Sequence, residues 1–261
     1  IQFTQADTAA TPLGGGHGGS RGMEVGGNAV AQAAGEIIEK AVPLAAHLLQ
    51  SDAAKVTFEN GTFSDATSGA SVSMNEVIES AEPGALDTGS TFERGVISIP
   101  NGCHAATVEV DPDTGAVELT GYWVMDDFGT IINPLLADGQ VMGGIAQGIG
   151  QALTENIVYD DSGQLITGSL MDYGLPRADV IPNMEIGYYE GAPTAKNPLG
   201  VKGAGEAGCV GSLPAVVNAV LDALKDHGVV HMEMPLTPEK VWRAIQDKGA
   251  HDPEGYMGDV N

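Results

Sequence analysis

The stretch Gly200-Val201-Lys202-Gly203-Ala204-Gly205-Glu206-Ala207-Gly208 places one carboxylate inside a run of glycines, directly before a predicted helix. Glycine accepts positive φ angles and lets other atoms approach the main chain closely. A ligand could therefore lie against this backbone, with Glu206 as the acid in reach and Ser212 as the predicted N-cap of the helix. A solvated glutamate on a flexible surface loop explains the same residues.

Two glycine spacings imitate the fingerprint of dinucleotide-binding sites, Gly203-x-Gly205-x-x-Gly208 and Gly14-x-Gly16-x-x-Gly19. That fingerprint also requires a β-α-β unit and an acid about 20 residues further on, at the end of the next strand. The acids downstream of both runs fall within or at the end of predicted helices: Asp222, Asp226, Glu36 and Glu39. The pattern therefore argues against a nicotinamide-dependent dehydrogenase.

The charge balance excludes several classes of partner. The chain has 35 acidic and 11 basic residues, which gives a net charge of −24. A nucleic-acid-binding protein needs a basic surface, and an anionic membrane surface would repel this chain for the same reason. The 261 residues are enough to bury a sizeable core, and the 37 glycines follow no fixed period. We therefore expect a globular protein with many tight turns and close backbone contacts.

The two cysteines, Cys103 and Cys209, are too few to ligate an iron–sulfur cluster or to form a structural zinc site. A reducing compartment is a simpler interpretation than a disulfide, so we expect a cytoplasmic protein. Neither a signal peptide nor an apolar run long enough to span a bilayer is visible in the sequence. Because the chain opens on Ile1 and directly on strand-like residues, we expect a further segment upstream or on another chain.

A second glycine-rich loop, Gly18-Gly19-Ser20-Arg21, precedes a predicted helix over residues 25–50. Unpaired amides at a helix N-terminus favour negative charge, and the guanidinium of Arg21 adds a fork that suits a phosphate. The loop is therefore a candidate anion cradle. A plain flexible glycine linker is the structural alternative.

A third glycine-rich segment follows Ile132-Asn133-Pro134, where the pattern predicts a helix over residues 135–153. Many glycines lower helix stability, so they make sense where the backbone packs tightly against something. Gln140, Gln147 and Gln151 share one face, either as hydrogen-bonding groups or as solvated side chains. The apolar stripe comprises Met142, Ile145, Ile149 and Leu153, and the glycines are Gly143, Gly144, Gly148 and Gly150.

The remaining pattern predicts an α+β fold of antiparallel strands and hairpins with packed helices. The dipeptide Asn60-Gly61 is a strong hairpin signal, and residues 83–91 are the one plausible linker, with a loose tail expected from Lys248. Predicted strands cover 1–4, 55–63, 104–110, 116–125, 157–160, 164–167 and 184–189. Predicted helices cover 25–50 (with Pro43 as a candidate break), 72–81, 135–153, the segment from Ser212 to before Gly228, and 237–245.

Taken together, these stretches resemble the molybdenum hydroxylases, the xanthine dehydrogenase, aldehyde oxidase and carbon monoxide dehydrogenase family. The resemblance is to the C-terminal molybdopterin-binding domain of the large subunit. It covers nearly the whole chain, which implies one domain over residues 1–261 with a candidate subdomain break near 83–91. The stretches that carry it are Gly18-Gly19-Ser20-Arg21, Ile132-Asn133-Pro134, residues 139–148 and residues 200–206.

The resemblance implies a role for each of these stretches. Glu206 matches the active-site glutamate beside the molybdenum and would act as the general base in a sheltered, glycine-lined pocket. The implied cofactor is molybdopterin, in its cytosine dinucleotide form. The implied cofactor-binding residues are Gly18, Gly19, Ser20 and Arg21 on the phosphate side, Asn133 and Gln140 at the pterin dinucleotide, and Lys202, Gly203, Ala204 and Gly205 beside the base.

The chain also departs from the complete family pattern. The first molybdopterin-binding domain, the cysteine motifs for two iron–sulfur clusters and a flavin domain are absent from the sequence. We therefore expect partner chains that carry the N-terminal molybdopterin-binding domain, a [2Fe-2S] subunit and an FAD subunit, with an aldehyde, an aromatic N-heterocycle or carbon monoxide as the small-molecule substrate. The rival hypothesis is a cofactor-holding or assembly subunit in which Glu206 does no chemistry.

Overall fold

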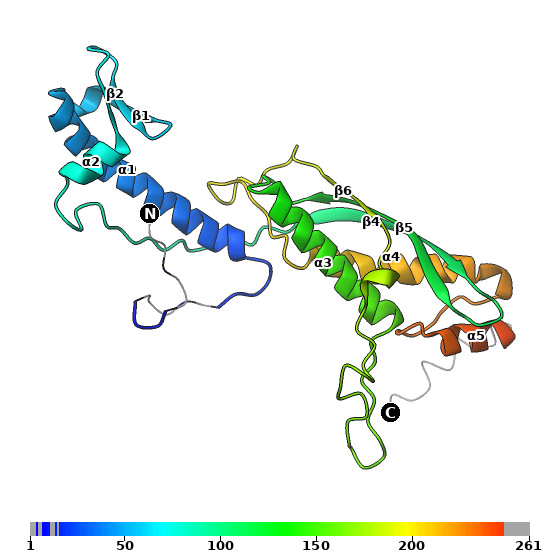
Figure 1. Cartoon of the computed structure of the whole chain (residues 1–261). Helices are drawn as coiled ribbons and strands as arrows, with labels where there is room; N and C mark the ends of the chain where they lie inside the picture. Colours follow the sequence, from blue (N-terminus) through cyan, green and yellow to red (C-terminus); the bar gives the residue numbers. More distant parts are fainter. Residues whose placement is uncertain (1–3, 5–6, 11–13, 15, 248–261) are drawn as a thin grey trace. The chain divides into compact units, whose positions relative to one another are not determined.

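The computed structural model describes residues 4, 7–10, 14 and 16–247, so most of the predicted strand 1–4 and the predicted tail from Lys248 lie outside the described residues. The chain forms two compact units (Figure 1). The first unit comprises Ile1–Gly22, Ser98–Lys196 and Gly200–Asn261. The second unit comprises Met23–Ile97 and Asn197–Leu199, and the predicted linker 83–91 lies within it.

In the second unit, a helix packs against a small sheet. A π-helical turn (Gly22–Gly27) leads into α1 (Asn28–Leu49), which continues through Pro43 without a break. Strands β1 (Val56–Glu59), β2 (Thr62–Asp65) and β3 (Ser71–Ser73) form an antiparallel sheet, followed by α2 (Met74–Ser80). The Asn60-Gly61 hairpin is confirmed, since both residues have positive φ. The core contains Ala41, Ala45, Ala46, Val56, Phe63, Val72 and Val77.

Two long strands dominate the first unit. Strands β4 (Asn101–Val110) and β5 (Val117–Asp127) pair antiparallel, which confirms the predicted strands 104–110 and 116–125. Strand β6 (Met184–Tyr188) pairs with β5 in parallel, so this sheet adds a parallel pair to the antiparallel strands that the sequence predicts. A helix and a long crossover separate β5 from β6, and a connection of that length permits parallel pairing.

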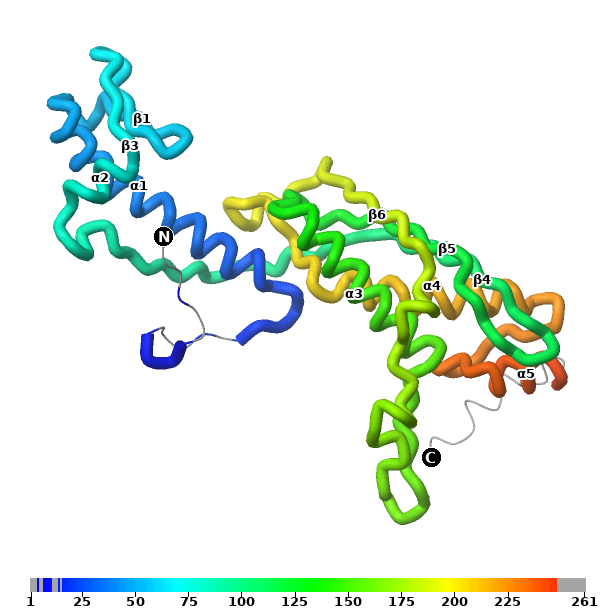
Figure 2. Tube along the Cα trace, in the orientation of Figure 1, coloured from blue at the N-terminus to red at the C-terminus, as the bar shows by residue number. Residues whose placement is uncertain are grey.

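Three helices complete the first unit: α3 (Pro134–Leu153), α4 (Ala207–Ala223) and α5 (Pro238–Gln246). Short 3-10 turns cover Ala53–Lys55 in the second unit and Ala178–Val180 and Lys225–His227 in the first. The chain between α3 and β6 leaves the helix as a long loop (Figure 2). In this loop the predicted strands 157–160 and 164–167 meet as a short antiparallel hairpin, with a Tyr159–Leu165 bridge and backbone hydrogen bonds from Asp160 to Gln164 and from Ile166 to Val158. The described part of the chain contains no helix with the length and apolarity needed to span a bilayer.

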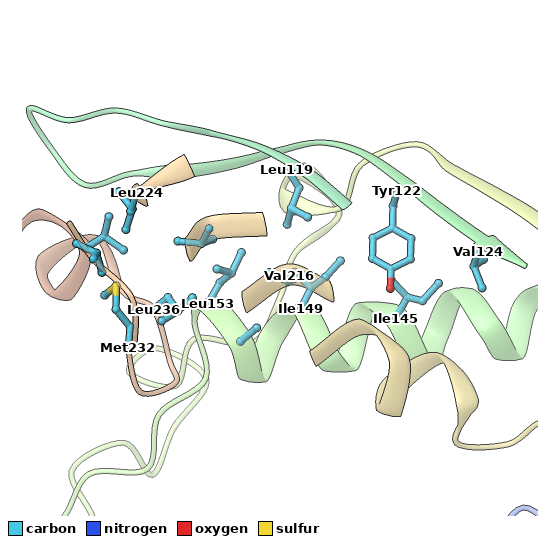
Figure 3. Packing of buried hydrophobic residues seen from close by; sticks show 14 of the residues in the cluster. Leu119, Tyr122, Val124, Ile145, Ile149, Leu153, Val216, Leu224, Met232 and Leu236 are labelled. Atoms are coloured by element: carbon cyan, nitrogen blue, oxygen red, sulfur yellow. The ribbon is translucent and has the colours of Figure 1, made fainter. Parts of the chain in front are cut away.

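The main core lies between the sheet and the two helices α3 and α4 (Figure 3). The predicted apolar stripe of α3 holds for Ile145, Ile149 and Leu153, whereas Met142 is exposed. The side chain of Val141 is buried instead, because Val141 stands four residues before Ile145 on the same helix face. The fully buried side chains include Tyr122, Val141, Ile145, Ile149, Val216, Val220 and Val241.

Helices α3 and α4 approach each other through glycine. A Cβ on Gly144 would lie 2.9 Å from the backbone nitrogen of Cys209, and a Cβ on Gly208 would lie 2.5 Å from the carbonyl oxygen of Val141. Ordinary carbon contacts are about 3.5–4.0 Å, so side chains at these positions would push the helices apart. The prediction that the glycines of residues 135–153 serve close packing is confirmed for Gly144. This contact sets the distance between the middle of α3 and the N-terminal end of α4.

The predicted N-cap of α4 is wrong. The helix begins at Ala207, and Glu206 itself occupies the cap position. Ser212 lies more than a turn inside the helix, where its buried hydroxyl donates a hydrogen bond to the carbonyl oxygen of Cys209 at 3.1 Å. The buried residues of α4 begin at Gly208 in its first turn, and a glycine adds no apolar side chain to the sequence pattern.

Candidate functional site

Glu206 ends the glycine-rich loop at the N-terminus of α4. The hydroxyl of Ser20 donates to Glu206 Oε2 at 2.6 Å, and the backbone N–H of Glu206 donates back to Ser20 Oγ at 3.0 Å. The side chain of Glu206 is exposed. The expectation that the carboxylate is sheltered is therefore not met within this chain, because the described residues leave one side of the loop open to solvent.

The two predicted glycine loops meet in space although they are 186 residues apart in sequence. A Cβ on Gly203 would lie 2.7 Å from the carbonyl oxygen of Ser20. A larger residue at Gly203 would therefore separate the loops. Gly205 also lies against Ser20, with Ser20 Oγ 3.4 Å from the position of its Cβ.

Helix α3 supplies the third segment of the site. The side-chain amide of Gln140 donates from Nε2 to the carbonyl oxygen of Gly205 at 2.7 Å. Gly205 therefore contacts both the Ser20 loop and α3. Three of the stretches that carry the family resemblance converge on Glu206, and they all belong to the first unit.

The loop is also fastened to the end of β5. Gly129 and Val201 form an isolated antiparallel bridge, and the N–H of Lys202 donates to the carbonyl oxygen of Phe128 at 2.7 Å. Gly129 has a φ of +67°, and a Cβ there would lie 2.1 Å from the carbonyl oxygen of Gly200. Only glycine satisfies both conditions without strain.

Lys202 directs its ammonium group toward Asp127, with 2.5 Å between Nζ and Oδ2. Burial alone would raise the pKa of Asp127. The hydrogen bond from Lys202, the amide of Gly129 and the charge of Lys202 outweigh burial and lower that pKa. This ion pair anchors the loop to the end of β5.

Asp127 is a residue that sequence analysis missed. It stands 75 residues before Lys202, and no local pattern reports such a pairing. The one available signal is the turn sequence Asp127-Phe128-Gly129, in which the carboxylate accepts a hydrogen bond from the N–H of Gly129 at 2.9 Å.

Two predicted cofactor-binding residues have structural contacts of their own. Asn133 caps α3, since its Oδ1 accepts a hydrogen bond from the N–H of Leu136 at 3.3 Å. Gln140 stands seven positions further along the chain, which corresponds to about 10 Å along a helix. Ala204 packs its side chain against the main core. Neither side chain joins the convergence at Glu206.

The backbone around the site leaves room for a ligand. No heavy atom lies within 4 Å of the Cβ positions of Gly18, Gly19, Gly139 and Gly143. Arg21 follows the first pair, and its Nη2 donates to the carbonyl oxygen of Gly16 at 2.6 Å. Donor groups and side-chain-free backbone fit a polyanionic cofactor. Within residues 16–247, no three His, Cys, Asp or Glu side chains are grouped to hold a metal ion.

The family model described as the molybdopterin cofactor-binding domain matches residues 1–182. The chain belongs to this family. The predicted resemblance to the molybdenum hydroxylases is therefore confirmed, and the α+β fold with it.

Among curated relatives, this domain is 40% identical over 248 residues to the nicotine 6-hydroxylase large subunit of Paenarthrobacter nicotinovorans, covering 91% of this chain and 30% of the relative. It is 33% identical over 256 residues to the carbon monoxide dehydrogenase large chain of Hydrogenophaga pseudoflava, covering 95% and 32%.

Two solved structures share the architecture of this domain. A Cu,Mo-CO dehydrogenase matches with a TM-score of 0.82 and 31% identity, over 94% of this chain and 32% of that chain. Quinoline 2-oxidoreductase from Pseudomonas putida 86 matches with a TM-score of 0.79 and 37% identity, over 92% and 32%. The chain therefore spans about a third of the length of the relatives it matches.

Proposed function

We propose that this chain is part of a molybdenum-dependent hydroxylase, holds molybdopterin as the cytosine dinucleotide, and supplies Glu206 as the general base. The observation that carries the proposal is the exposed carboxylate of Glu206, held where three segments of a molybdopterin cofactor-binding domain converge. An exposed acid alone would be unremarkable on such an acidic chain. An acid fixed at that convergence is suited to chemistry on a bound cofactor.

The residues present fit the proposed cofactor. Gly18 and Gly19 leave space along the backbone, and Arg21 provides the guanidinium that suits a dinucleotide phosphate. Gln140 lies beside the open positions Gly139 and Gly143 on α3, at the edge of the same loop. The bound cofactor would supply the oxygen-transfer and two-electron redox chemistry, which no side chain can provide.

The proposed role of Glu206 is to accept the proton that this chemistry releases. One carboxylate oxygen, Oε2, is held by Ser20, and Oε1 has no protein partner among the described residues. A base needs a lone pair that points away from its own supports, and Oε1 meets that requirement. The rest of the larger protein would have to close the open side of the loop and exclude water.

We propose an aromatic N-heterocycle as the first substrate class to test, ahead of aldehydes and carbon monoxide. Two of the relatives are named for nicotine and quinoline, and they are 40% and 37% identical to this chain. An aldehyde oxidoreductase of Megalodesulfovibrio gigas is 30% identical. The chain therefore shares more sequence identity with these two proteins that are named for N-heterocycles than with the aldehyde oxidoreductase.

The proposed partners are the remainder of the large subunit with the N-terminal molybdopterin-binding domain, a [2Fe-2S] subunit and an FAD subunit. Relatives are named as a large subunit and as a subunit gamma of a complex. Electrons that leave the cofactor need a path to an acceptor, and this chain has only two cysteines with which to hold a cluster.

The test is Glu206→Gln in the assembled enzyme, since glutamine keeps the shape of the side chain but does not accept the proton. We expect kcat to fall by about 10²- to 10⁴-fold, with molybdenum and pterin content unchanged. The matched control is Glu239→Gln, the same change at an exposed position of α5 that pairs with Arg243. Full activity in Glu206→Gln would refute the assignment.

The alternative is a cofactor-holding or assembly subunit, and the bonds between Ser20 and Glu206 favour it, because they also tie two loops together. In that case Glu206→Gln would lose molybdenum or subunits rather than kcat per bound metal. A nicotinamide-dependent dehydrogenase has less support, since α4 is followed by no strand within the described residues up to 247.

A further inference from the structure

We propose that Ser20 is a positioning residue for Glu206, and that its hydroxyl does not bind the cofactor phosphate. The inference rests on the proposed function of Glu206 as the base. It changes the role that the family resemblance implies for Ser20, while Gly18, Gly19 and Arg21 keep theirs.

The hydrogen-bonding capacity of a hydroxyl decides between the two roles. A serine hydroxyl has one proton to donate and two lone pairs that accept. Ser20 donates its proton to Glu206 Oε2 at 2.6 Å and accepts the N–H of Glu206 at 3.0 Å. An ionised phosphate oxygen can only accept. Ser20 could therefore bind a phosphate through its hydroxyl only by releasing the carboxylate.

The backbone of Ser20 supports a fixed role. Its φ is +55°, in the left-handed region that residues with a Cβ rarely adopt. The other two described non-glycine residues with positive φ occupy common places for it, Gln50 after the last turn of α1 and Asn60 in a hairpin turn. Ser20 lies in neither setting. Such a conformation persists where surrounding contacts determine it, and here Gly203 lies directly against it.

The consequence is a carboxylate with a defined direction. An exposed glutamate samples many side-chain rotamers, since several of its torsions are free. Fixing Oε2 at Ser20 removes most of these and leaves Oε1 to accept the proton. Because a displacement of about 1 Å can reduce a rate about 100-fold, loss of the Ser20 hydroxyl should act on kcat through Glu206.

The experiment compares Ser20→Ala and Ser20→Gly in the assembled enzyme. Both lose the hydroxyl, but glycine relieves the strain of the positive φ, so Ser20→Gly should unfold at a higher temperature than Ser20→Ala. We expect kcat to fall about 10- to 100-fold in both variants, with KM and molybdenum content within about 2-fold of the parent. A purely structural role would make kcat follow stability instead.

A double-mutant cycle connects the effect to Glu206. In the Glu206→Gln background, Ser20→Ala should cause no further loss of kcat, because the group it positions is already removed. A readout independent of activity is hydrogen exchange at the backbone amide of Glu206, which should accelerate in Ser20→Ala when its acceptor is lost.

The outcomes separate this proposal from the proposed function. If Glu206→Gln retains full activity, both are overturned. If Glu206→Gln loses activity while Ser20→Ala keeps kcat within about 2-fold, the role of Glu206 stands and positioning by Ser20 is overturned. Loss of pterin dinucleotide from Ser20→Ala, with normal kcat per bound molybdenum, would make Ser20 a phosphate ligand and overturn the proposal as well.

Discussion

The contact between α3 and α4 offers a sharp test, because two adjacent glycines of α3 lie in opposite environments. Gly144 faces α4, where a Cβ would lie 2.9 Å from the nitrogen of Cys209 and 3.0 Å from the Cα of Gly208. Gly143 is exposed, with no heavy atom within 4 Å of its Cβ position. We predict that Gly144→Ala and Gly143→Ala change stability in different directions.

The magnitudes follow from two terms. Either substitution removes the cost of a glycine inside a helix, about 1 kcal/mol. Gly143→Ala should therefore raise the free energy of unfolding by up to about 1 kcal/mol. In Gly144→Ala the new methyl group must displace backbone atoms, and overpacking of this kind costs about 1–3 kcal/mol. The two variants should differ by about 2 kcal/mol, with Gly144→Ala the less stable.

The assay is urea unfolding followed by tryptophan fluorescence. The chain has two tryptophans, Trp123 and Trp242, and both belong to the first unit, which contains the contact. A difference of about 2 kcal/mol corresponds to about 4–8 °C in Tm for a unit of this size. Thermal unfolding by circular dichroism provides a second measurement.

Equal stability of the two variants would contradict the close α3–α4 contact. A Gly144→Ala variant more stable than Gly143→Ala would contradict it more strongly. In the assembled enzyme, Gly144→Ala should also weaken activity, since the spacing of the helices places Gln140 against Gly205.

Two further predictions concern the attachment of the loop to β5. Because the pKa of Asp127 is lowered in the fold, its ionised carboxylate stabilises the fold at pH values above the unfolded pKa of about 3.9. The stability difference between the parent and Asp127→Asn should therefore be constant near neutral pH and shrink as the pH falls below about 4. Urea titrations at several pH values measure this, and a difference that grows toward low pH would contradict it. Gly129→Ala should lower the free energy of unfolding by about 2 kcal/mol or more, because the positive φ and the carbonyl oxygen of Gly200 oppose a Cβ; an unchanged Tm would refute that reason.

Local patterns predicted most of the elements. Asn60-Gly61, the apolar spacing of α3, and Thr237-Pro238 at the start of α5 depend on neighbouring residues only, so their signals are complete within a short window. The start of α4 was predicted wrongly for the same reason. Its first turn packs through Gly208, and glycine contributes nothing to an apolar periodicity.

The sequence by itself determined the glycine-rich loops, the lone Glu206 and the family resemblance, because these are properties of residue order. The tertiary structure alone decided which groups hold that carboxylate. Ser20, Gln140 and Lys202 each bond to a residue at least 65 positions away. Those pairings arise only when the packing of α3 on α4, and of the loop on β5, brings distant segments together, and a one-dimensional pattern contains no information about such distances.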